Sequence, residues 1–188
     1  MTDALPTFDA QYMRKRMFLS WRGEIIADAV AKTLNPRHVV DFGCATGDIA
    51  RGLLDLGIQA WGVDSSPAAG GCLPPSRFIQ QDLVKGFFAP PEDLCAVMAY
   101  HDPLDLVILL EVLSILPDRS DRRRVLRQAD IWGSTLLVNR LDRGDRKWLG
   151  KGGKRFCPDK TDELRRRLEK WGHRPAVKAL YRTGEVWA

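Results

Sequence analysis

The chain has 188 residues, of which 45% are hydrophobic and 28% are charged. This length corresponds to about one domain, and the composition is that of an ordinary globular protein rather than a disordered or fibrous one. The 29 Lys and Arg residues outnumber the 24 Asp and Glu residues, and the formal charge of +5 is a mild bias toward anionic partners.

The first half of the chain alternates helical patterns with apolar runs of strand length. One or two helices are expected over residues 9–34, because Ile25, Ile26, Val30 and Leu34 fall on one helical face. The expected segments that follow are a buried strand over 38–42, a helix over 48–56, a second strand over 60–63 and, after a segment broken by prolines, a short third strand over 77–80.

The second half continues this alternation. Residues 104–110 are almost wholly apolar, as in a central parallel strand, and a charged helix over 119–130 and a fifth strand over 135–139 follow. A further helix is expected over 161–171, with Thr161 as its N-cap and Glu163 close behind. Two terminal segments, 176–181 and 185–188, are expected to pair antiparallel at the sheet edge.

This order of elements predicts a fold of the α/β class. Strands that alternate with helices form βαβ units, so we expect a Rossmann-like single domain with a mainly parallel sheet, an antiparallel C-terminal edge and an N-terminal helical segment. The sequence contains no internal repeat and no linker that would divide it.

The start of the chain and the cysteines indicate a cytoplasmic protein. The first ten residues lack the basic start and apolar run of a secretory signal, and no apolar stretch approaches the roughly 20 residues of a membrane span. Cys44, Cys72, Cys95 and Cys157 are scattered and form no CxxC pair. We therefore expect reduced cysteines, no metal site and no membrane partner.

The strongest motif is Val39-Val-Asp-Phe-Gly-Cys-Ala-Thr-Gly47. It places Asp41 at the end of a buried strand, followed by two glycines spaced as G-x-x-x-G and then by a helix. Glycines at a strand-to-helix turn let the backbone approach a ligand closely, and the helix N-terminus favours a negative group. The motif therefore predicts a ligand site at this turn.

Two classes of ligand use such a turn. A dinucleotide site needs G-x-G-x-x-G around a pyrophosphate, but Ala45 and Asp48 stand at the second and third glycine positions. Asp41 and Asp48 would also repel a pyrophosphate. S-adenosylmethionine has no phosphate and carries an ammonium, a sulfonium and a carboxylate, so this methyl donor fits better than a dinucleotide.

Two further acidic residues end the next two strands. Trp61-Gly-Val-Asp-Ser65 ends with Asp64 roughly 20 residues beyond the first turn, where a carboxylate can hold ribose hydroxyls. In Ile79-Gln-Gln-Asp-Leu83, Asp82 can accept a hydrogen bond from an adenine amino group while the Leu83 backbone N–H donates one. Both pieces stand in the order that an adenosine ligand requires.

Together these runs resemble the class I S-adenosylmethionine-dependent methyltransferases. The resemblance continues in Leu104-Asp-Leu-Val-Ile-Leu-Leu-Glu-Val-Leu-Ser-Ile-Leu-Pro117, covers residues 37–140 well and extends more loosely to the helix over 161–171. It implies that the methionine end of the cofactor is contacted by Asp41, Gly43, Cys44, Ala45 and Gly47. It also implies contacts from Asp64 and Ser65 to the ribose and from Asp82 and Leu83 to the adenine. Leu110 and Glu111 are implied to lie beside the sulfonium.

The chain departs from the family pattern in the run that follows the strand expected over 104–110. Many relatives read Glu-Val-Leu-Glu-His-Leu there, whereas this sequence has Ser114 and Ile115 in place of the Glu-His pair. His38, His101 and His173 all precede strands, away from the edge where such sites form. If a general base is used, Glu111, Tyr12 or Asp142 must supply it, and orientation of the reactants is expected to do most of the work.

Two segments flank the expected cofactor-binding core over residues 36–140. The helical segment over 1–35 either packs on the sheet or forms a lid that brings Tyr12 or Arg14 to the site. Residues 140–155 contain seven basic and two acidic residues, several glycines and Trp148, and are expected to be an irregular loop. We interpret 141–160 as a mobile basic substrate loop, with a solvated surface loop or a nucleic-acid contact as alternatives.

The function expected from these features is methyl transfer from S-adenosylmethionine, with S-adenosylhomocysteine as product. The acceptor is expected to be an O or N nucleophile of a small-molecule, anionic substrate. Alternatives are a nucleic-acid (RNA) methyltransferase and a non-catalytic S-adenosylmethionine-binding protein. The sequence lacks the Asn-Pro-Pro-Tyr and Asp-Pro-Pro-Tyr motifs that resemble amino-methylating DNA enzymes.

Overall fold

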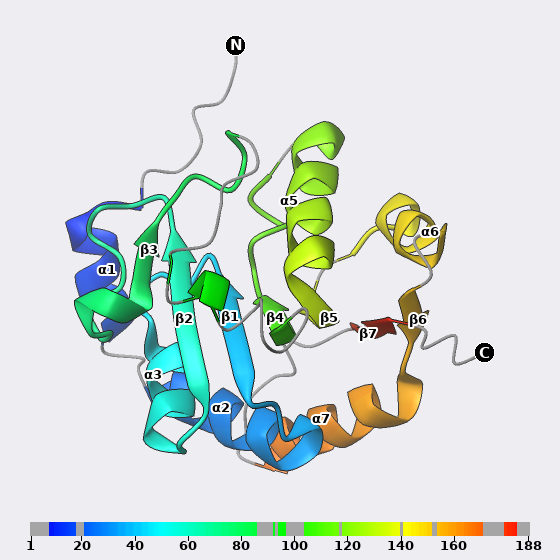
Figure 1. Ribbon diagram of the computed structural model, residues 1–188, viewed down its shortest axis with the longest axis horizontal. Helices are drawn as coiled ribbons and strands as arrows, with labels where there is room; N and C mark the ends of the chain where they lie inside the picture. Colours follow the sequence, from blue (N-terminus) through cyan, green and yellow to red (C-terminus); the bar gives the residue numbers. More distant parts are fainter. Residues whose placement is uncertain are drawn as a thin grey trace.

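A seven-stranded sheet runs through the molecule in the order β3-β2-β1-β4-β5-β7-β6 (Figure 1). The computed structural model describes residues 8–17, 21–85, 92, 94–96, 104–116, 118–139, 141–151, 154–170 and 179–183. The parallel strands are β1 (His38–Phe42), β2 (Gln59–Asp64), β3 (Phe78–Gln80), β4 (Leu104–Leu109) and β5 (Gly133–Val138). The edge is antiparallel: β7 (Ala179–Thr183) pairs with β5, and β6 (Lys154–Phe156) pairs with β7. The predicted α/β fold and its five parallel strands are confirmed.

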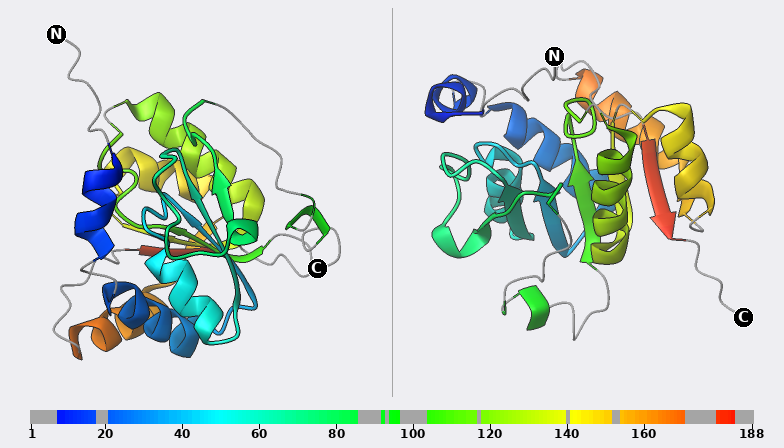
Figure 2. Two further views of the ribbon diagram at one scale, coloured as in Figure 1. Left: turned by 90° about the vertical axis from the view of Figure 1, so that its left-hand side faces the viewer. Right: turned by 90° about the horizontal axis from the view of Figure 1, so that it is seen from above.

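Helices cover both faces of this sheet (Figure 2). They are α1 (Ala10–Met17), α2 (Trp21–Leu34), α3 (Asp48–Asp55), α5 (Arg119–Trp132), α6 (Arg143–Lys151) and α7 (Pro158–Lys170). Consecutive strand residues point to opposite faces, so Val40 packs with α5 and α6 in one core while Val39 packs with α2, α3 and α7 in the other. Both cores are apolar, which explains why the central strands read as continuous hydrophobic runs.

Two glycines bring α3 close to α2. A Cβ on Gly23 would lie 2.5 Å from the carbonyl carbon of Asp48, and a Cβ on Gly52 would lie 2.8 Å from the Cβ of Ala27. This close approach holds the N-terminus of α3, and with it the turn after β1, against the body of the domain. No helix in the described residues has the length and apolar character needed to cross a bilayer.

The expectation of an irregular loop over residues 140–155 is wrong, because this segment folds into α6 and β6. The Asp142 carboxylate accepts a hydrogen bond from the backbone N–H of Asp145 (2.7 Å), as an N-cap does. Asp145 is fully buried and forms an ion pair with Arg122 of α5. Leu149 is buried and Trp148 is half-buried against the core. These tertiary contacts outweigh the low helix propensity of the glycines.

The C-terminal part differs from expectation in two further details. Thr161 is not an N-cap: α7 begins at Pro158, and the buried Thr161 hydroxyl donates to the carbonyl of Cys157 (2.8 Å). Proline is favoured in the first helical turn because it needs no hydrogen-bond partner there. The strand expected over 176–181 is found at Ala179–Thr183, and β6 pairs with it; the expected segment 185–188 lies outside the described residues.

Candidate functional site

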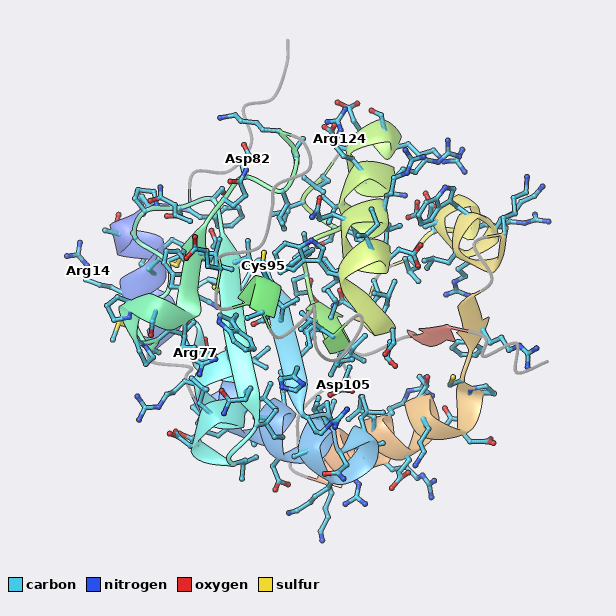
Figure 3. All side chains as sticks on the ribbon, viewed as in Figure 1. Arg14, Arg77, Asp82, Cys95, Asp105 and Arg124 are labelled. Atoms are coloured by element: carbon cyan, nitrogen blue, oxygen red, sulfur yellow. The ribbon has the colours of Figure 1, made fainter. Side chains whose placement is uncertain are left out.

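The carboxyl ends of the five parallel strands meet at one edge of the sheet. The order reverses between β1 and β4, which are neighbours although they are far apart in the chain. In open α/β sheets, ligands bind at such a switch point. Figure 3 shows Asp82 at this edge and Asp105 near the opposite one, and the predicted cofactor-binding residues lie at or just beyond the strand ends.

The turn after β1 is built from unusual backbone conformations. Gly43 and Gly47 have φ of +75° and +84°, and Ala45 has φ of +49°. A Cβ on Gly43 would lie 2.5 Å from Val112 Cγ2, and one on Gly47 would lie 2.6 Å from Leu73 Cγ. Both glycines of the G-x-x-x-G motif are therefore required by positive φ and by close packing.

The Asp64 carboxylate links the turns after β1 and β2. It accepts hydrogen bonds from the backbone N–H of Ala45 and of Ser66, each at 2.9 Å. Because each carboxylate oxygen has two lone pairs, Asp64 keeps acceptor capacity for a ligand hydroxyl. Ser65, the predicted neighbour at the ribose, is exposed, whereas Ser66 is buried.

A loop stands where a helix usually connects β2 to β3. Residues 65–77 contain only a short 3₁₀ turn, Pro75–Arg77. Gly70 N–H and Cys72 N–H donate to the carbonyls of Ala45 and Thr46, at 2.7 and 2.9 Å. The Ser66 hydroxyl donates to the carbonyl of Phe8 (2.6 Å), so the segment that leads into α1 is tied to the turn after β2.

The turn after β3 is held from two sides. Asp82 accepts from the Val84 backbone N–H (2.9 Å), and its other oxygen lies 3.6 Å from Lys85 Nζ. Arg124 of α5 donates from Nη1 to the Val84 carbonyl (2.6 Å), and Figure 3 shows Asp82 and Arg124 at the same edge. Leu83 is buried within this turn. The arrangement presents Asp82 and the Leu83 backbone in a fixed geometry.

Three carboxylates surround the methionine end of the site. Asp41 is 3% exposed, and its pKa is raised well above the ordinary value, chiefly by burial and further by the charges of Asp48 and Asp64. The Arg16 guanidinium of α1 acts in the opposite direction. This excess of negative charge fits a ligand with an ammonium and a sulfonium and disfavours a pyrophosphate. The residues present therefore fit S-adenosylmethionine.

Replacing Asp41 by asparagine should change stability and binding in opposite directions. Because its folded pKa is raised, folded Asp41 binds more protons than the unfolded chain, so wild-type stability falls as pH rises from the ordinary aspartate range through that pKa. Asp41→Asn removes this loss, which is at most about 1.4 kcal/mol per pH unit. A bound cation favours the charged form of Asp41, so Asp41→Asn should also weaken binding of the cationic cofactor.

Urea unfolding of both proteins across this pH range, with calorimetry at neutral pH, tests the prediction. The advantage of Asp41→Asn in free energy of unfolding should grow with pH. Parallel stability curves would mean that the pKa of Asp41 is the same in the folded and the unfolded protein.

Cys44 contributes its backbone to the turn. Its N–H and that of Gly43 donate to the carbonyl of Val63, at 3.1 and 2.7 Å. The pKa of the Cys44 thiol is raised well above its ordinary value, first by burial and then by the charge of Asp41. The thiol therefore stays protonated and is unsuited to act as a nucleophile.

The three predicted base candidates lie in different settings. Glu111 is exposed just beyond β4, next to Leu110, which is half-buried. Tyr12 is half-buried on α1, with its ring 4.9 Å from that of Phe8. Asp142 caps α6 and pairs with Arg122; its pKa is lowered, first by the hydrogen bond from the Asp145 backbone and also by the Arg122 charge. A lowered pKa makes Asp142 a weaker base, so its position favours a structural role.

Other predicted side chains lie away from this edge. His38 begins β1, at the amino end of the sheet, and its Nδ1 lies 3.6 Å from Asp105 Oδ2. His101 and His173 lie outside the described residues. Arg14 is exposed and points away from the sheet in Figure 3, so Arg16 is the α1 cation that acts on Asp41.

Sequence reasoning missed three residues at this edge, namely Arg16, Ser66 and Asn139. Asn139 is 1% exposed and pairs with Glu111. Like Asp41, Asp64 and Asp82, it is the polar residue that ends an apolar strand run, and this position could have identified it. Arg16 and Ser66 carry no such local signal, because their contacts are with residues remote in the chain.

Comparison with known proteins places the chain among methyltransferases. A family model described as a methyltransferase domain matches residues 12–176. No curated protein matches the sequence.

Three solved structures share the fold at low identity. A TehB-like S-adenosylmethionine-dependent methyltransferase from Corynebacterium glutamicum has a TM-score of 0.65 at 17% identity, over 92% of this chain and 96% of its own. A Methanococcus maripaludis protein described as an S-adenosylmethionine-dependent methyltransferase has a TM-score of 0.57 at 13% identity over 100% of both chains. Magnesium protoporphyrin IX methyltransferase from Synechocystis PCC 6803, with bound S-adenosylmethionine, has a TM-score of 0.55 at 20% identity, over 78% of this chain and 74% of its own.

The family model spans most of the chain. The chain therefore belongs to the methyltransferase domain family, and its resemblance to the class I S-adenosylmethionine-dependent methyltransferases is confirmed.

Proposed function

We propose that this methyltransferase transfers the methyl group of S-adenosylmethionine to an O or N nucleophile of a small, anionic molecule in the cytoplasm. The observation that carries the proposal is the carboxylate-rich turn at the switch point, where burial and the charges of Asp48 and Asp64 raise the pKa of Asp41 and the Arg16 guanidinium of α1 opposes them. A site of this charge selects a cationic ligand over a phosphate.

In this proposal each strand end holds one part of the cofactor. The turn at 43–47, together with Asp41, would hold the methionine end. Asp64 and Ser65 would hold the ribose. Asp82 and Leu83 would hold the adenine, and Leu110 and Glu111 would lie beside the sulfonium. Because α2 packs in a core layer, we confine the proposed lid to residues before it, where Phe8 is tied to Ser66.

The residues of the chain act chiefly by positioning. When bound, S-adenosylmethionine supplies a methyl group on a charged sulfur that is already a good leaving group. Backbone N–H groups and carboxylates fixed by the sheet hold the donor in one orientation, so the acceptor needs only to be aligned with it. Tyr12 and Glu111 are the candidates for contact with the acceptor.

Exposed cations on α5 and α6 suit an anionic substrate. Arg146, Lys147 and Lys151 of α6 are exposed and form no ion pair with other residues in the described ranges. Arg123 and Arg127 of α5 share these properties, and α5 is joined to α6 by the Arg122–Asp145 ion pair. This surface supports a carboxylate or phosphate on the substrate. It is also the feature that favours the second candidate, an RNA methyltransferase.

Calorimetry tests the cofactor part of the proposal. S-adenosylmethionine and S-adenosylhomocysteine should bind, and NAD should not, because the acidic turn repels its pyrophosphate. Tighter binding of NAD than of the methyl donor would contradict the proposal. Turnover of labelled S-adenosylmethionine then separates an enzyme from a non-catalytic binding protein, and strong salt dependence of turnover would favour RNA over a small acid.

A further inference from the structure

Glu111 is held in an uncommon backbone conformation at the end of β4. Its φ is +64°, in the left-handed region that a residue with a Cβ seldom adopts. Such strain persists only where the surrounding structure maintains it, and it concentrates at functional sites. The Ser114 hydroxyl, which donates to the Glu111 carbonyl at 2.8 Å, is one contact that maintains it.

Asn139 holds Glu111 through both its backbone and its side chain. The Glu111 backbone N–H donates to Asn139 Oδ1 (2.7 Å), and Asn139 Nδ2 donates to Glu111 Oε1 (2.6 Å). Asn139 is almost fully buried just after β5, so it has a single fixed position. The Glu111–Asn139 pair therefore fixes a carboxylate across the ends of two adjacent strands while leaving Glu111 exposed.

The Glu111–Asn139 pair lies where the methyl acceptor would bind in the proposed function. Glu111 follows β4, which adjoins β1 at the switch point. Val112, the next residue, packs so closely on Gly43 that a Cβ there would lie 2.5 Å from it. The Glu111 backbone thus lies next to the turn proposed to hold the methionine end, while Asn139 holds its carboxylate on the β5 side of β4.

We propose that the Glu111–Asn139 pair selects a neutral amine as the methyl acceptor, with Asn139 as the positioning residue. This inference rests on the proposed function and narrows its O or N nucleophile to nitrogen. A fixed negative charge stabilises positive charge that develops next to it, and it repels an anionic nucleophile such as a carboxylate or phenolate. The anionic part of the substrate then lies elsewhere, toward the cations of α5 and α6.

The charge balance of the transfer explains the preference. The nitrogen lone pair forms the new N–C bond as the S–C bond breaks, and the electron pair of that bond goes to sulfur. The positive charge moves from sulfur to nitrogen, and the methylated ammonium later loses a proton to water. An alcohol would instead have to give up its proton to a general base during the transfer, whereas a neutral amine needs no proton removed before the N–C bond forms. No histidine of the described residues lies at this edge.

The identity of the product tests the inference. The protein is incubated with methyl-tritiated S-adenosylmethionine and a metabolite extract, and the labelled product is treated with alkali and applied to a cation exchanger in acid. The label should resist alkali and bind the exchanger, as an N-methylammonium does. Label released as methanol, or an alkali-stable neutral ether, would overturn the inference but leave a methyltransferase. No labelled product, despite calorimetric binding of the cofactor, would overturn the proposed function itself.

Variants that exchange the acid and the amide between positions 111 and 139 distinguish a role of the Glu111 charge in catalysis from a role of the pair in folding stability. Glu111→Gln should lower kcat, measured at saturating S-adenosylmethionine, on the order of 100-fold. Asn139→Asp should lower Tm, because two carboxylates then face each other. The double variant Glu111→Gln/Asn139→Asp restores a donor–acceptor pair, so its Tm should return to the wild-type value while kcat stays low.

The control is Asp118→Asn, an exposed acid at the start of α5 whose side chain makes no capping hydrogen bond; it should leave Tm and kcat unchanged. Recovery of kcat together with Tm in the double variant would show that Glu111 need not carry the negative charge and would overturn the inference, as would full activity of Glu111→Gln.

Discussion

Arg122→Met should lower the free energy of unfolding by about 3–5 kcal/mol, the loss expected when one partner of a buried ion pair is removed. Arg122 Nη2 lies 2.8 Å from Asp145 Oδ2, and the two side chains are 18% and 0% exposed. Methionine retains much of the apolar stem but leaves the Asp145 carboxylate without its cation. Urea unfolding followed by fluorescence or circular dichroism measures the change.

The matched control is Arg123→Met, on the same helix but exposed, which should change stability by less than about 0.5 kcal/mol. The double variant Arg122→Met/Asp145→Asn should recover part of the loss, because no buried charge is left unpaired. A loss below about 1 kcal/mol for Arg122→Met would mean that α6 is only loosely docked. In that case the interpretation of residues 141–160 as a mobile substrate loop would be favoured after all.

Asp64→Ala should weaken binding of S-adenosylmethionine about tenfold or more, because hydrogen bonds to a charged acceptor contribute about 1.5–3 kcal/mol each. In the wild-type protein the Asp64 carboxylate also accepts hydrogen bonds from the backbone N–H groups of Ala45 and Ser66. Leaving these donors without a partner should cost stability, about 1–3 kcal/mol for each donor that water cannot reach. Affinity is therefore measured by calorimetry at a temperature where the variant is fully folded.

Asp105→Ala is the matched control for this loss of backbone support. Asp105 Oδ2 accepts from the backbone N–H of Arg37 and of His38, at 2.8 and 3.0 Å, but it lies near the opposite edge of the sheet (Figure 3). Its replacement should reduce stability and leave cofactor affinity unchanged. Equal affinities of the two variants would contradict a ribose-binding role for Asp64 and reduce it to a turn residue.

The sequence by itself determined the parallel core and the position of the candidate cofactor site. Apolar runs and helical periodicity are local signals, and β1 begins and ends at the predicted residues, His38 and Phe42. Once five strands are parallel, their carboxyl ends must meet, so Asp41, Asp64 and Asp82 could be placed at one edge from their positions alone. The glycines of the first turn followed from the same reasoning.

Only the tertiary structure decided the features that depend on contacts between distant residues. The segment with α6 and β6 reads as an irregular loop, because its helix depends on an ion pair to Arg122, 23 positions from Asp145, and on packing against the core. The hydrogen bonds between Glu111 and Asn139 span 28 positions, and the one between Ser66 and Phe8 spans 58. Propensity and periodicity describe neighbours along a chain, whereas these contacts form only after the sheet has brought its strand ends together.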